Sequence, residues 1–305
     1  MAFAMGSSQP STYTQTKYPI MLVHGVSGFD DLLGFYDYWY KFPDTLKKDG
    51  ATVRCAEVSP WNSIEQRGED LLQQIKQFLA ETGKTKVNLI AHSQGSPTSR
   101  YVAYMRPDLV ASITTIAGPH KGTPVGDFLI STPNAVEGLA YNILELEGQL
   151  IYFFTGNSIE QDAQASIYSL SSEGIAQFNQ TYPCAGVPVT KNGEGAYSEN
   201  YTFNGQTYNI KYFSWTGTNS VTNVLDPLEL LFGAMGAVIN LYGHEPANDG
   251  AVPAFSARFG QVLRADYPWN HADEVNQVCG ILGLLAPDPL SVVRTHANRL
   301  KTMGL

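Results

Sequence analysis

The sequence predicts an α/β domain with a mostly parallel sheet and helices on both faces. Through the first 120 residues, short apolar segments typical of strands alternate with longer segments typical of helices. Such alternation requires crossover connections, and these build parallel sheets that are covered on both faces. A length of 305 residues suits one large domain of this class. We therefore expect a single domain over residues 18–305.

The expected strands are short apolar runs bounded by turn residues. Residues 18–24 end at Gly25 and are almost entirely apolar, as buried parallel strands are. Asn204 and Gly205 stand between two strand-like flanks and indicate a hairpin. The expected strands cover residues 18–24, 51–58, 86–91, 110–117, the two arms of 201–213, and 260–264.

The expected helices carry apolar residues at steps of three and four. The segment from Ile64 to Gly83 is the clearest, because its apolar positions form one stripe and Gly83 is a residue type that ends helices. Further helical patterns cover residues 94–105, 136–154, 226–242 and 291–301. Residues 1–17 lack the basic start and apolar core of a signal peptide, and we expect a flexible tail there.

Charge and composition exclude several classes of protein. The formal net charge is −9, whereas nucleic-acid binding needs lysines and arginines that replace phosphate counterions. The longest uncharged apolar run, residues 230–239, is too short to span a membrane. The three cysteines fit no zinc or redox spacing, and at most one disulfide can form. We expect Cys55 and Cys279 to pack as small apolar residues.

A serine at the end of the third expected strand is the candidate nucleophile. Ser93 stands between this strand and a helix, with Ala91 two residues before it and Gly95 two residues after it. The α/β-hydrolase fold places its nucleophile on such a sharp strand-to-helix turn, which needs small neighbours. The five-residue motif is weak by itself, and its position gives it weight. The alternative is a serine that only caps the following helix.

Two backbone N–H groups are candidates for binding an oxyanion. The N–H of Gln94 lies at a helix start, where the helix dipole favours negative charge. A second donor must come from a loop after another strand. We expect the N–H of Val26, because Gly25 before it allows close backbone approach. His24 is expected to have a structural role.

His271 is the candidate base. In this fold the acid and the histidine follow the serine in the chain, in that order. His271 stands in a proline-containing loop after a strand-like segment. His120 is too near Ser93 in sequence, His244 precedes the best acid, and His296 lies in a basic terminal helix.

Asp249 is the candidate acid. It lies in an Asn-Asp-Gly turn that precedes the last expected strand. The competing acids are Asp226, Asp266 and Asp273, and the last two are too close to His271 for a separate loop. The alternative for Asp249 is an ordinary turn aspartate.

From residue 18 to residue 301 the sequence resembles the Pseudomonas-type bacterial triacylglycerol lipases of lipase family I, which have the α/β-hydrolase fold with a helical lid. Over this range the matching words occur in the family's order. They are Val23-His24-Gly25 with Gly28-Phe29-Asp30, Ala91-His92-Ser93-Gln94-Gly95, Pro119-His120-Lys121-Gly122, Leu225-Asp226-Pro227, Asn248-Asp249-Gly250, the block from Asn270 to Val278, and the block from Arg294 to Lys301. The resemblance implies a triad of Ser93, Asp249 and His271.

The resemblance also implies one structural calcium ion. Its ligands would be the carboxylates of Asp226 and Asp273 and the main-chain oxygens of Gln277 and Ile281. Calcium takes hard oxygen ligands of this kind. The ion would fix the loop that carries His271, which helps to hold the base within reach of the serine.

The resemblance also implies a lid, and one expected disulfide is missing from this chain. Residues 125–160 are expected to form a lid whose apolar face covers an acyl pocket in water. The alternative for this stretch is an ordinary helix packed on the core. Many members have a disulfide near positions 192 and 255, where this chain has Asn192 and Phe255.

The expected substrate is an acylglycerol or another ester at a lipid–water interface. The resemblance implies a secreted protein and, as in some members, a foldase chaperone as partner. We expect a monomer without a transmembrane segment. Two other functions stay open. One is an esterase or acyltransferase that uses the same triad on short acyl groups, and the other is an inactive hydrolase fold that binds lipids or partners.

Overall fold

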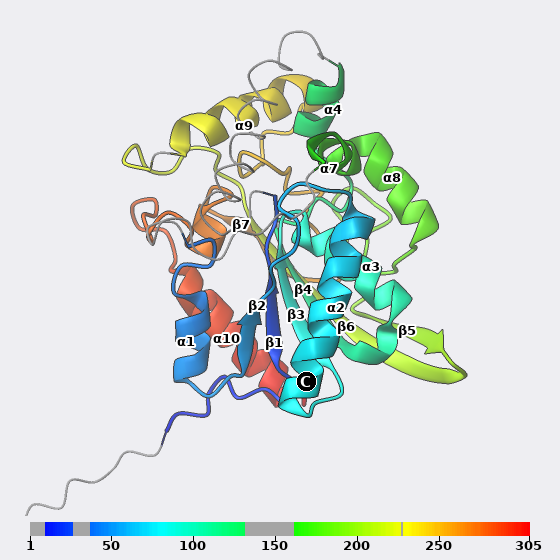
Figure 1. Ribbon diagram of the computed structural model, residues 1–305. Helices are drawn as coiled ribbons and strands as arrows, with labels where there is room; N and C mark the ends of the chain where they lie inside the picture. Colours follow the sequence, from blue (N-terminus) through cyan, green and yellow to red (C-terminus); the bar gives the residue numbers. More distant parts are fainter. Residues whose placement is uncertain (1–9, 27–36, 132–161, 227) are drawn as a thin grey trace, which may run out of the picture.

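The computed structural model describes residues 10–26, 37–131, 162–226 and 228–305. In these residues seven strands form one sheet, in the order β2-β1-β3-β4-β6-β5, with β7 beside β6 (Figure 1). All neighbouring pairs are parallel except β5 and β6. The strands are β1 (Ile20–Val23), β2 (Val53–Cys55), β3 (Val87–His92), β4 (Val110–Ile116), β5 (Ser198–Phe203), β6 (Gln206–Gly217) and β7 (Gln261–Tyr267). The predicted α/β class is confirmed.

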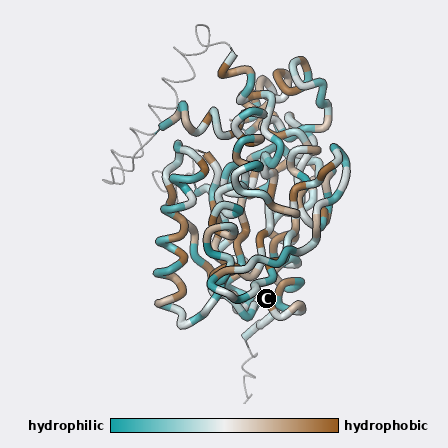
Figure 2. The backbone as a smooth tube through the Cα atoms, turned by 90° about the vertical axis from the view of Figure 1, so that its right-hand side faces the viewer, coloured by the Kyte–Doolittle hydropathy of each residue, from teal (hydrophilic) through white to brown (hydrophobic). Residues whose placement is uncertain are grey.

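Helices cover both faces of the sheet. The α-helices are α1 (Phe42–Lys48), α2 (Ile64–Thr82), α3 (Gly95–Met105), α4 (Pro124–Ser131), α7 (Ala163–Leu170), α8 (Ser172–Thr181), α9 (Glu229–Gly243) and α10 (Pro289–Thr302). Two short 3₁₀ helices, η1 (Pro107–Leu109) and η3 (Asp273–Val275), complete the described elements. Along the flanking helices hydrophilic and hydrophobic residues alternate (Figure 2), as expected for helices with one buried face.

The two-residue period of the strands divides the core into two layers. On β1, Met21 and Val23 point toward α2, α3 and α8. Ile20 and Leu22 point the other way, toward α1 and α10. Because side chains of a strand alternate between faces, a strand that is buried on both sides must be apolar throughout. This is the pattern of residues 18–24.

The long elements lie close to their predicted positions. The helix predicted from Ile64 is α2, where Ser63 caps the first turn by accepting from Gln66 N, and Gly83 follows with φ 65°. The predicted hairpin is formed by β5 and β6, with φ 50° at Asn204 and φ 74° at Gly205. These left-handed values are the ones that a two-residue hairpin turn of this type needs.

Several expectations differ from the structure. Residues 12–17 are not a free tail, because Thr14 is buried and its N–H donates to Asp49 O, and Lys17 N–H donates to Leu305 O. Cys279 is exposed and does not pack as a small apolar residue, because it lies in a tight turn with φ 48°. None of the three cysteines forms a disulfide. The predicted helix over 136–154, and with it most of the predicted lid, lies outside the described residues.

Candidate active site

Ser93 lies on a strained turn between β3 and α3. Its φ is 54°, in the left-handed region that serine seldom adopts. Its own N–H donates to Ile116 O at 3.0 Å, and its carbonyl accepts from Ser96 N at 2.9 Å. A Cβ atom on Gly95 would lie 2.3 Å from Val23 O, so only glycine fits there. The turn therefore has the geometry of a nucleophile elbow, at the carboxyl edge of the sheet.

The loop after β1 lies directly against Ser93. A Cβ atom on Gly25 would lie 2.5 Å from Ser93 Cβ and 3.1 Å from Ser93 Oγ. No side chain can therefore stand between this loop and the serine. Val26, the candidate oxyanion donor from this loop, is the next residue and is half-buried.

The peptide that carries the Val26 N–H is held through its carbonyl oxygen. Gly25 O accepts from His24 Nδ1 at 2.8 Å and from Arg67 Nη2 at 3.2 Å. Because the peptide unit is planar and trans, the Val26 N–H points away from these two donors. Burial, and then the charge of Arg67, lowers the pKa of His24 to about 3. His24 is thus neutral and structural, as expected.

Arg67 is a buried cation that interacts with the segments that follow β1 and β2. It is fully buried, and it donates to the carbonyls of His24 and Ser59. Burial lowers its pKa to about 10, so the guanidinium remains charged at neutral pH. Nothing in the local sequence of α2 distinguishes this arginine from an exposed one, and sequence reasoning missed it.

His271 and Asp249 form a buried pair. His271 Nδ1 lies 2.7 Å from Asp249 Oδ2. The other carboxylate oxygen of Asp249 accepts from the N–H groups of Ala251 and Val252 at 2.8 and 2.7 Å. His271 N–H also donates to Asp249 O at 2.9 Å. Asp249 is therefore both a turn aspartate and the partner of the histidine, so the two interpretations of this residue are compatible.

The histidine pair lies beside the elbow. The ring of His92, which precedes Ser93, has its centroid 4.4 Å from that of His271. His92 Nδ1 in turn lies 2.5 Å from the hydroxyl of Tyr38, and that hydroxyl accepts from Gly25 N at 2.8 Å. Burial, and then the charge of His271, holds the pKa of His92 well below its usual range. Tyr38 thus connects the elbow with the loop after β1.

The three histidines that were not chosen as the base, His120, His244 and His296, have no carboxylate beside them among the described residues. His120 is buried with Nε2 3.2 Å from Thr115 Oγ1. His296 is buried with Nε2 2.7 Å from Thr114 Oγ1. His244 is exposed and ends α9 in a left-handed conformation. None of the three has a carboxylate partner among the described residues.

Glu274 is a further buried acid that sequence reasoning missed. Its side chain is fully buried and accepts from Gly217 N. Burial raises its pKa well above the usual range, and the neighbouring charge of Asp249 raises it further. The one sign in the sequence was its position three residues after His271. That Glu274 lies near Asp249 cannot be inferred without the fold.

Two of the four residues expected to hold calcium, Asp226 and Asp273, lie around Asn270. Its side-chain Nδ2 lies 3.4 Å from Asp226 Oδ2 and 3.3 Å from Glu229 Oε2, and its N–H donates to Asp273 Oδ2 at 3.2 Å. All three carboxyls are buried. Burial is the main cause that raises the pKa of Asp273 to about 7, and the charges of Asp226 and Glu229 add to it. Glu229 was missed as a member of this cluster.

The two residues expected to contribute main-chain oxygens lie near Ala272: Gln277 N–H donates to Ala272 O, and Ile281 packs against the cluster that contains Ala272. Gln277 is buried and Ile281 is half-buried, and both follow η3. Within the described ranges, His, Cys, Asp and Glu side chains form no group of three or more that could hold a metal ion alone. A calcium site here would therefore depend on main-chain oxygens as well as carboxylates, which is common for this ion.

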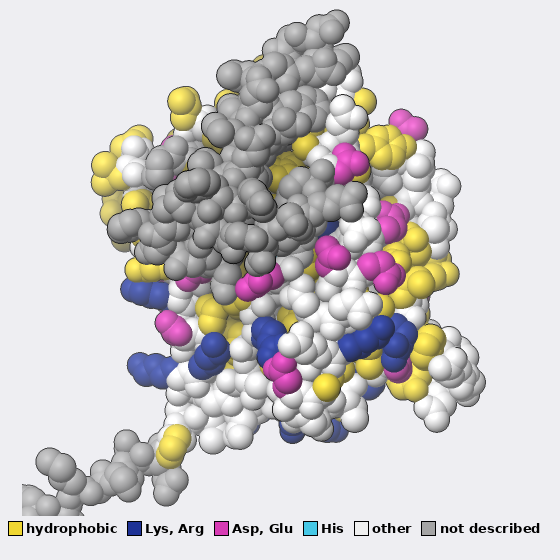
Figure 3. Space-filling model, viewed as in Figure 1, with side chains coloured by type: hydrophobic (Ala, Val, Ile, Leu, Met, Phe, Trp, Pro, Cys, Tyr) yellow, Lys and Arg dark blue, Asp and Glu magenta, His cyan; other side chains and the backbone are white. Residues whose placement is uncertain are grey.

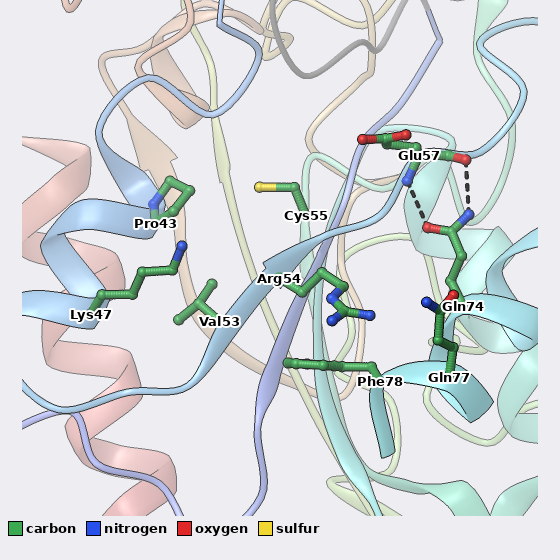
Figure 4. A pocket seen from close by; sticks show the side chains of 9 residues that line it. All are labelled: Pro43, Lys47, Val53, Arg54, Cys55, Glu57, Gln74, Gln77 and Phe78. Carbon is green, nitrogen blue, oxygen red and sulfur yellow. Dashed lines mark hydrogen bonds between the residues drawn. The ribbon is translucent and has the colours of Figure 1, made fainter. Parts of the chain in front are cut away.

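A separate cavity lies on the outer side of β2 (Figure 4). It has a volume of about 570 Å³ and is lined by residues of α1, β2 and α2. Gln74 closes one end by bonding the backbone of Glu57 in both directions. None of the candidate catalytic residues lines this cavity.

Known proteins resemble this chain in both sequence and fold. A family model described as alpha/beta hydrolase fold matches residues 18–215. A triacylglycerol lipase of Vibrio cholerae is 48% identical, covering 96% of this chain and 90% of that protein. Triacylglycerol lipases of Burkholderia plantarii and Pseudomonas fragi are 38% and 34% identical and cover 100% and 95% of this chain, respectively 92% and 98% of those proteins.

Solved structures show the same fold at lower identity. The lipase of Staphylococcus hyicus has a TM-score of 0.65 at 18% identity, covering 98% of this chain and 99% of that one. No helix in the described ranges has the length and apolar character needed to cross a membrane. The strained serine turn and the long matches to curated lipases agree, and the chain belongs to the α/β-hydrolase family and, within it, to the bacterial triacylglycerol lipases.

Proposed function

We propose that this triacylglycerol lipase cleaves acylglycerol esters with Ser93 as nucleophile, His271 as base and Asp249 as the acid that orients the base. The observation that carries the proposal is the buried bond between His271 Nδ1 and Asp249 Oδ2, at 2.7 Å, beside a serine with φ 54°. Serine is a poor nucleophile unless a base accepts its proton. In this arrangement the ring of the base, His271, contacts the ring of His92, the residue before Ser93.

The proposed reaction has two acyl-transfer steps. Ser93 Oγ attacks the ester carbonyl while His271 Nε2 accepts the hydroxyl proton. His271 then returns the proton to the leaving alcohol, and water attacks the acyl-enzyme in the same way. Asp249 keeps the Nδ1–H tautomer and stabilises the imidazolium. This role suits a carboxylate that also accepts from two backbone N–H groups, because these bonds fix its orientation.

The proposed oxyanion hole consists of the N–H groups of Val26 and Gln94. Such donors accelerate a reaction when they already point to the place where charge develops. The bonds of His24 and Arg67 to Gly25 O support this role for Val26. The side chain of Gln94 donates to Asn62 O at 2.9 Å and to Ser169 Oγ at 3.1 Å, which fixes the start of α3.

A calcium ion fits the acidic cluster beside the base. We propose that the carboxylates of Asp226 and Asp273 and the main-chain oxygens of Gln277 and Ile281 would hold it. Three buried carboxyls lie together there, and none of them has a Lys or Arg partner within the described ranges. A divalent cation would neutralise this charge and tie Asp226 to the loop of His271. Secretion, a lid over residues 125–160 and a foldase partner stay predictions from the resemblance.

Replacing the nucleophile tests the assignment. For Ser93→Ala we expect the kcat for p-nitrophenyl butyrate to fall on the order of 10⁵-fold. Ser99→Ala is the matched control, because Ser99 is also buried on α3 and its hydroxyl bonds Gly95 O at 2.8 Å. The control should keep nearly full activity. A fluorophosphonate probe should label the wild-type chain at Ser93. An active Ser93→Ala protein would overturn the proposal.

A further inference from the structure

Two loops of this chain expose large aliphatic side chains at their tips. In residues 221–225, Val224 is 89% exposed and Leu225 is 77% exposed. In residues 282–286, Leu284 and Leu285 are each 93% exposed. Single exposed aliphatic residues are normal on protein surfaces, whereas four together indicate a contact surface. We call these two segments the paired apolar loops.

The paired apolar loops lie side by side although they are distant in sequence. Asn223 Nδ2 donates to Leu282 O at 2.8 Å, and a Cβ atom on Gly283 would lie 3.3 Å from Thr222 O. In Figure 1 they are the yellow-green and orange loops at the left, next to α9. In Figure 3 hydrophobic side chains gather at the same flank. The tips therefore form one surface.

Local hydrogen bonds hold these side chains outward. Leu225 N–H donates to Asn223 Oδ1 at 3.0 Å, and Ala286 N–H donates to Gly283 O at 3.1 Å. Leu285 has φ 63°, a left-handed conformation that leucine seldom adopts. Because each turn is closed by its own bond, the leucines are presented to solvent and do not fold back on the core.

The surface is neutral on an acidic protein. Residues 219–225 and 279–287 contain no charged side chain. Asp226 at one boundary is buried, and Asp288 at the other caps α10 by accepting from Leu290 N and Ser291 Oγ. The whole chain carries a formal net charge of −9. An anionic membrane would repel such a protein, whereas a neutral oil surface would not.

We propose that the paired apolar loops insert into the surface of a neutral lipid phase and orient the enzyme on it, independently of the predicted lid. The proposal rests on the proposed function, since it identifies the phase that presents the substrate. Geometry links the two, because Asn270 Nδ2 lies 3.2 Å from Thr222 Oγ1. Thr222 belongs to the first loop and Asn270 precedes the base. Leu230, in the first turn of α9 shortly after the first loop, is also 85% exposed.

The test measures binding without turnover. The double substitution Leu284→Asn and Leu285→Asn is made in the Ser93→Ala protein, since asparagine tolerates the left-handed conformation. Flotation with triolein droplets coated with phosphatidylcholine gives the partition constant. We expect it to fall roughly tenfold to a hundredfold. Met105→Ser is the matched control and should bind normally. Met105 is 40% exposed at the end of α3 that is remote from the serine turn.

Further measurements separate the possible outcomes. In the active enzyme, the same two leucine substitutions should leave hydrolysis of soluble p-nitrophenyl acetate unchanged and slow hydrolysis of emulsified triolein. Equal droplet binding by the Ser93→Ala protein with and without the two leucine substitutions would overturn the proposal. Stronger binding of the Ser93→Ala protein to vesicles that contain phosphatidylglycerol than to droplets would also overturn it. So would two leucine substitutions that turn a dimer into a monomer and leave droplet binding unchanged. A wild-type chain that binds droplets but does not cleave p-nitrophenyl acetate would refute the proposed function and leave the anchor intact.

Discussion

At the scale of single residues, the site depends on space that only glycine leaves free. Gly25 needs no left-handed conformation, since its φ lies outside that region. Its importance is steric, because a Cβ atom there would lie 2.5 Å from Ser93 Cβ and 2.9 Å from the Tyr38 hydroxyl. Both neighbours are buried and cannot move aside freely. Gly83 is the opposite case, with φ 65° and no atom within 4 Å of an added Cβ.

These two glycines give a matched pair of substitutions. Gly25→Ala should lower kcat for p-nitrophenyl butyrate by roughly 10²-fold or more, because the loop of the oxyanion donor must move away from Ser93. Gly83→Ala should leave kcat unchanged and lower the free energy of unfolding by about 1 kcal/mol. Steady-state kinetics and urea unfolding measure the two effects. Equal kcat values for Gly25→Ala and wild type would show that the loop does not act on the serine.

The sequence indicated the candidate site residues that lie in recognisable motifs. It did not indicate the neighbours that only tertiary packing brings to the site. Ser93 and Asp249 stand in turns with local signatures, and His271 follows them in the order of the fold. Tyr38 and Arg67 have no such signature. Their contacts with the Gly25 backbone arise only when α2 and the segment before α1 pack against β1, so no local pattern could reveal them.

At the scale of elements, α10 contributes a buried histidine that must stay neutral. His296 contacts Thr114 on β4 and Arg299 on its own helix, and the rings of Phe213 and Trp215 pack around it. Burial, and then the charge of Arg299, lowers its pKa to about 3. The unfolded chain binds a proton near pH 6.5. The contribution of His296 to stability is therefore complete above that pH and is lost as the pH falls toward 3.

The replacement His296→Gln should make the protein less sensitive to acid. Between pH 6 and 4 the free energy of unfolding should fall less steeply, by about 1.4 kcal/mol per pH unit, because one proton fewer is taken up on unfolding. Urea unfolding at several pH values measures the slope. At pH 8 the two proteins should differ only by the lost hydrogen bonds, which gives an internal reference. Parallel curves would mean that His296 is protonated in the folded chain.

The helices with long periodic patterns were predicted, and the short helices α1, α7 and α8 were not. The stripe of α2 extends over 19 residues and has a serine cap and a terminal glycine. By contrast α1 has 7 residues and no side-chain cap, and α7 and α8 are also short. Such helices exist because the core covers them, since isolated short helices are unstable. Their positions are a consequence of the fold.

At the scale of the whole molecule, hydrogen bonds join segments that are distant in sequence, and no pattern of apolar residues marks these segments. Backbone bonds join residues 12–17 to Asp49 and to the C-terminal Leu305. The polar composition of this segment predicted a free tail, because hydrogen bonds of the backbone leave no trace in the sequence. The acidic cluster around Asn270 is a second closure of this kind, since it joins the start of α9 to the loop of the proposed base.

Calcium should therefore stabilise the whole fold. An ion that binds only the folded chain, at a concentration of about 100 Kd, adds about 2.7 kcal/mol, which corresponds to a rise in Tm of about 4 °C for a chain of this length. We expect EDTA to lower Tm by that amount and added Ca²⁺ to restore it. Magnesium should restore it less, because it requires stricter octahedral geometry.

The variant Asp226→Asn identifies the site, because it removes one proposed ligand and keeps the shape of the side chain. Its Tm should no longer respond to EDTA. Asp266→Asn is the matched control, since Asp266 on β7 is exposed and its ion pair among the described residues is with Arg264. Its response to EDTA should equal that of the wild type. If wild-type melting curves coincide with and without EDTA, the buried carboxyls must be neutralised by protons. The loop of His271 would then be held by the bonds of Asn270 alone.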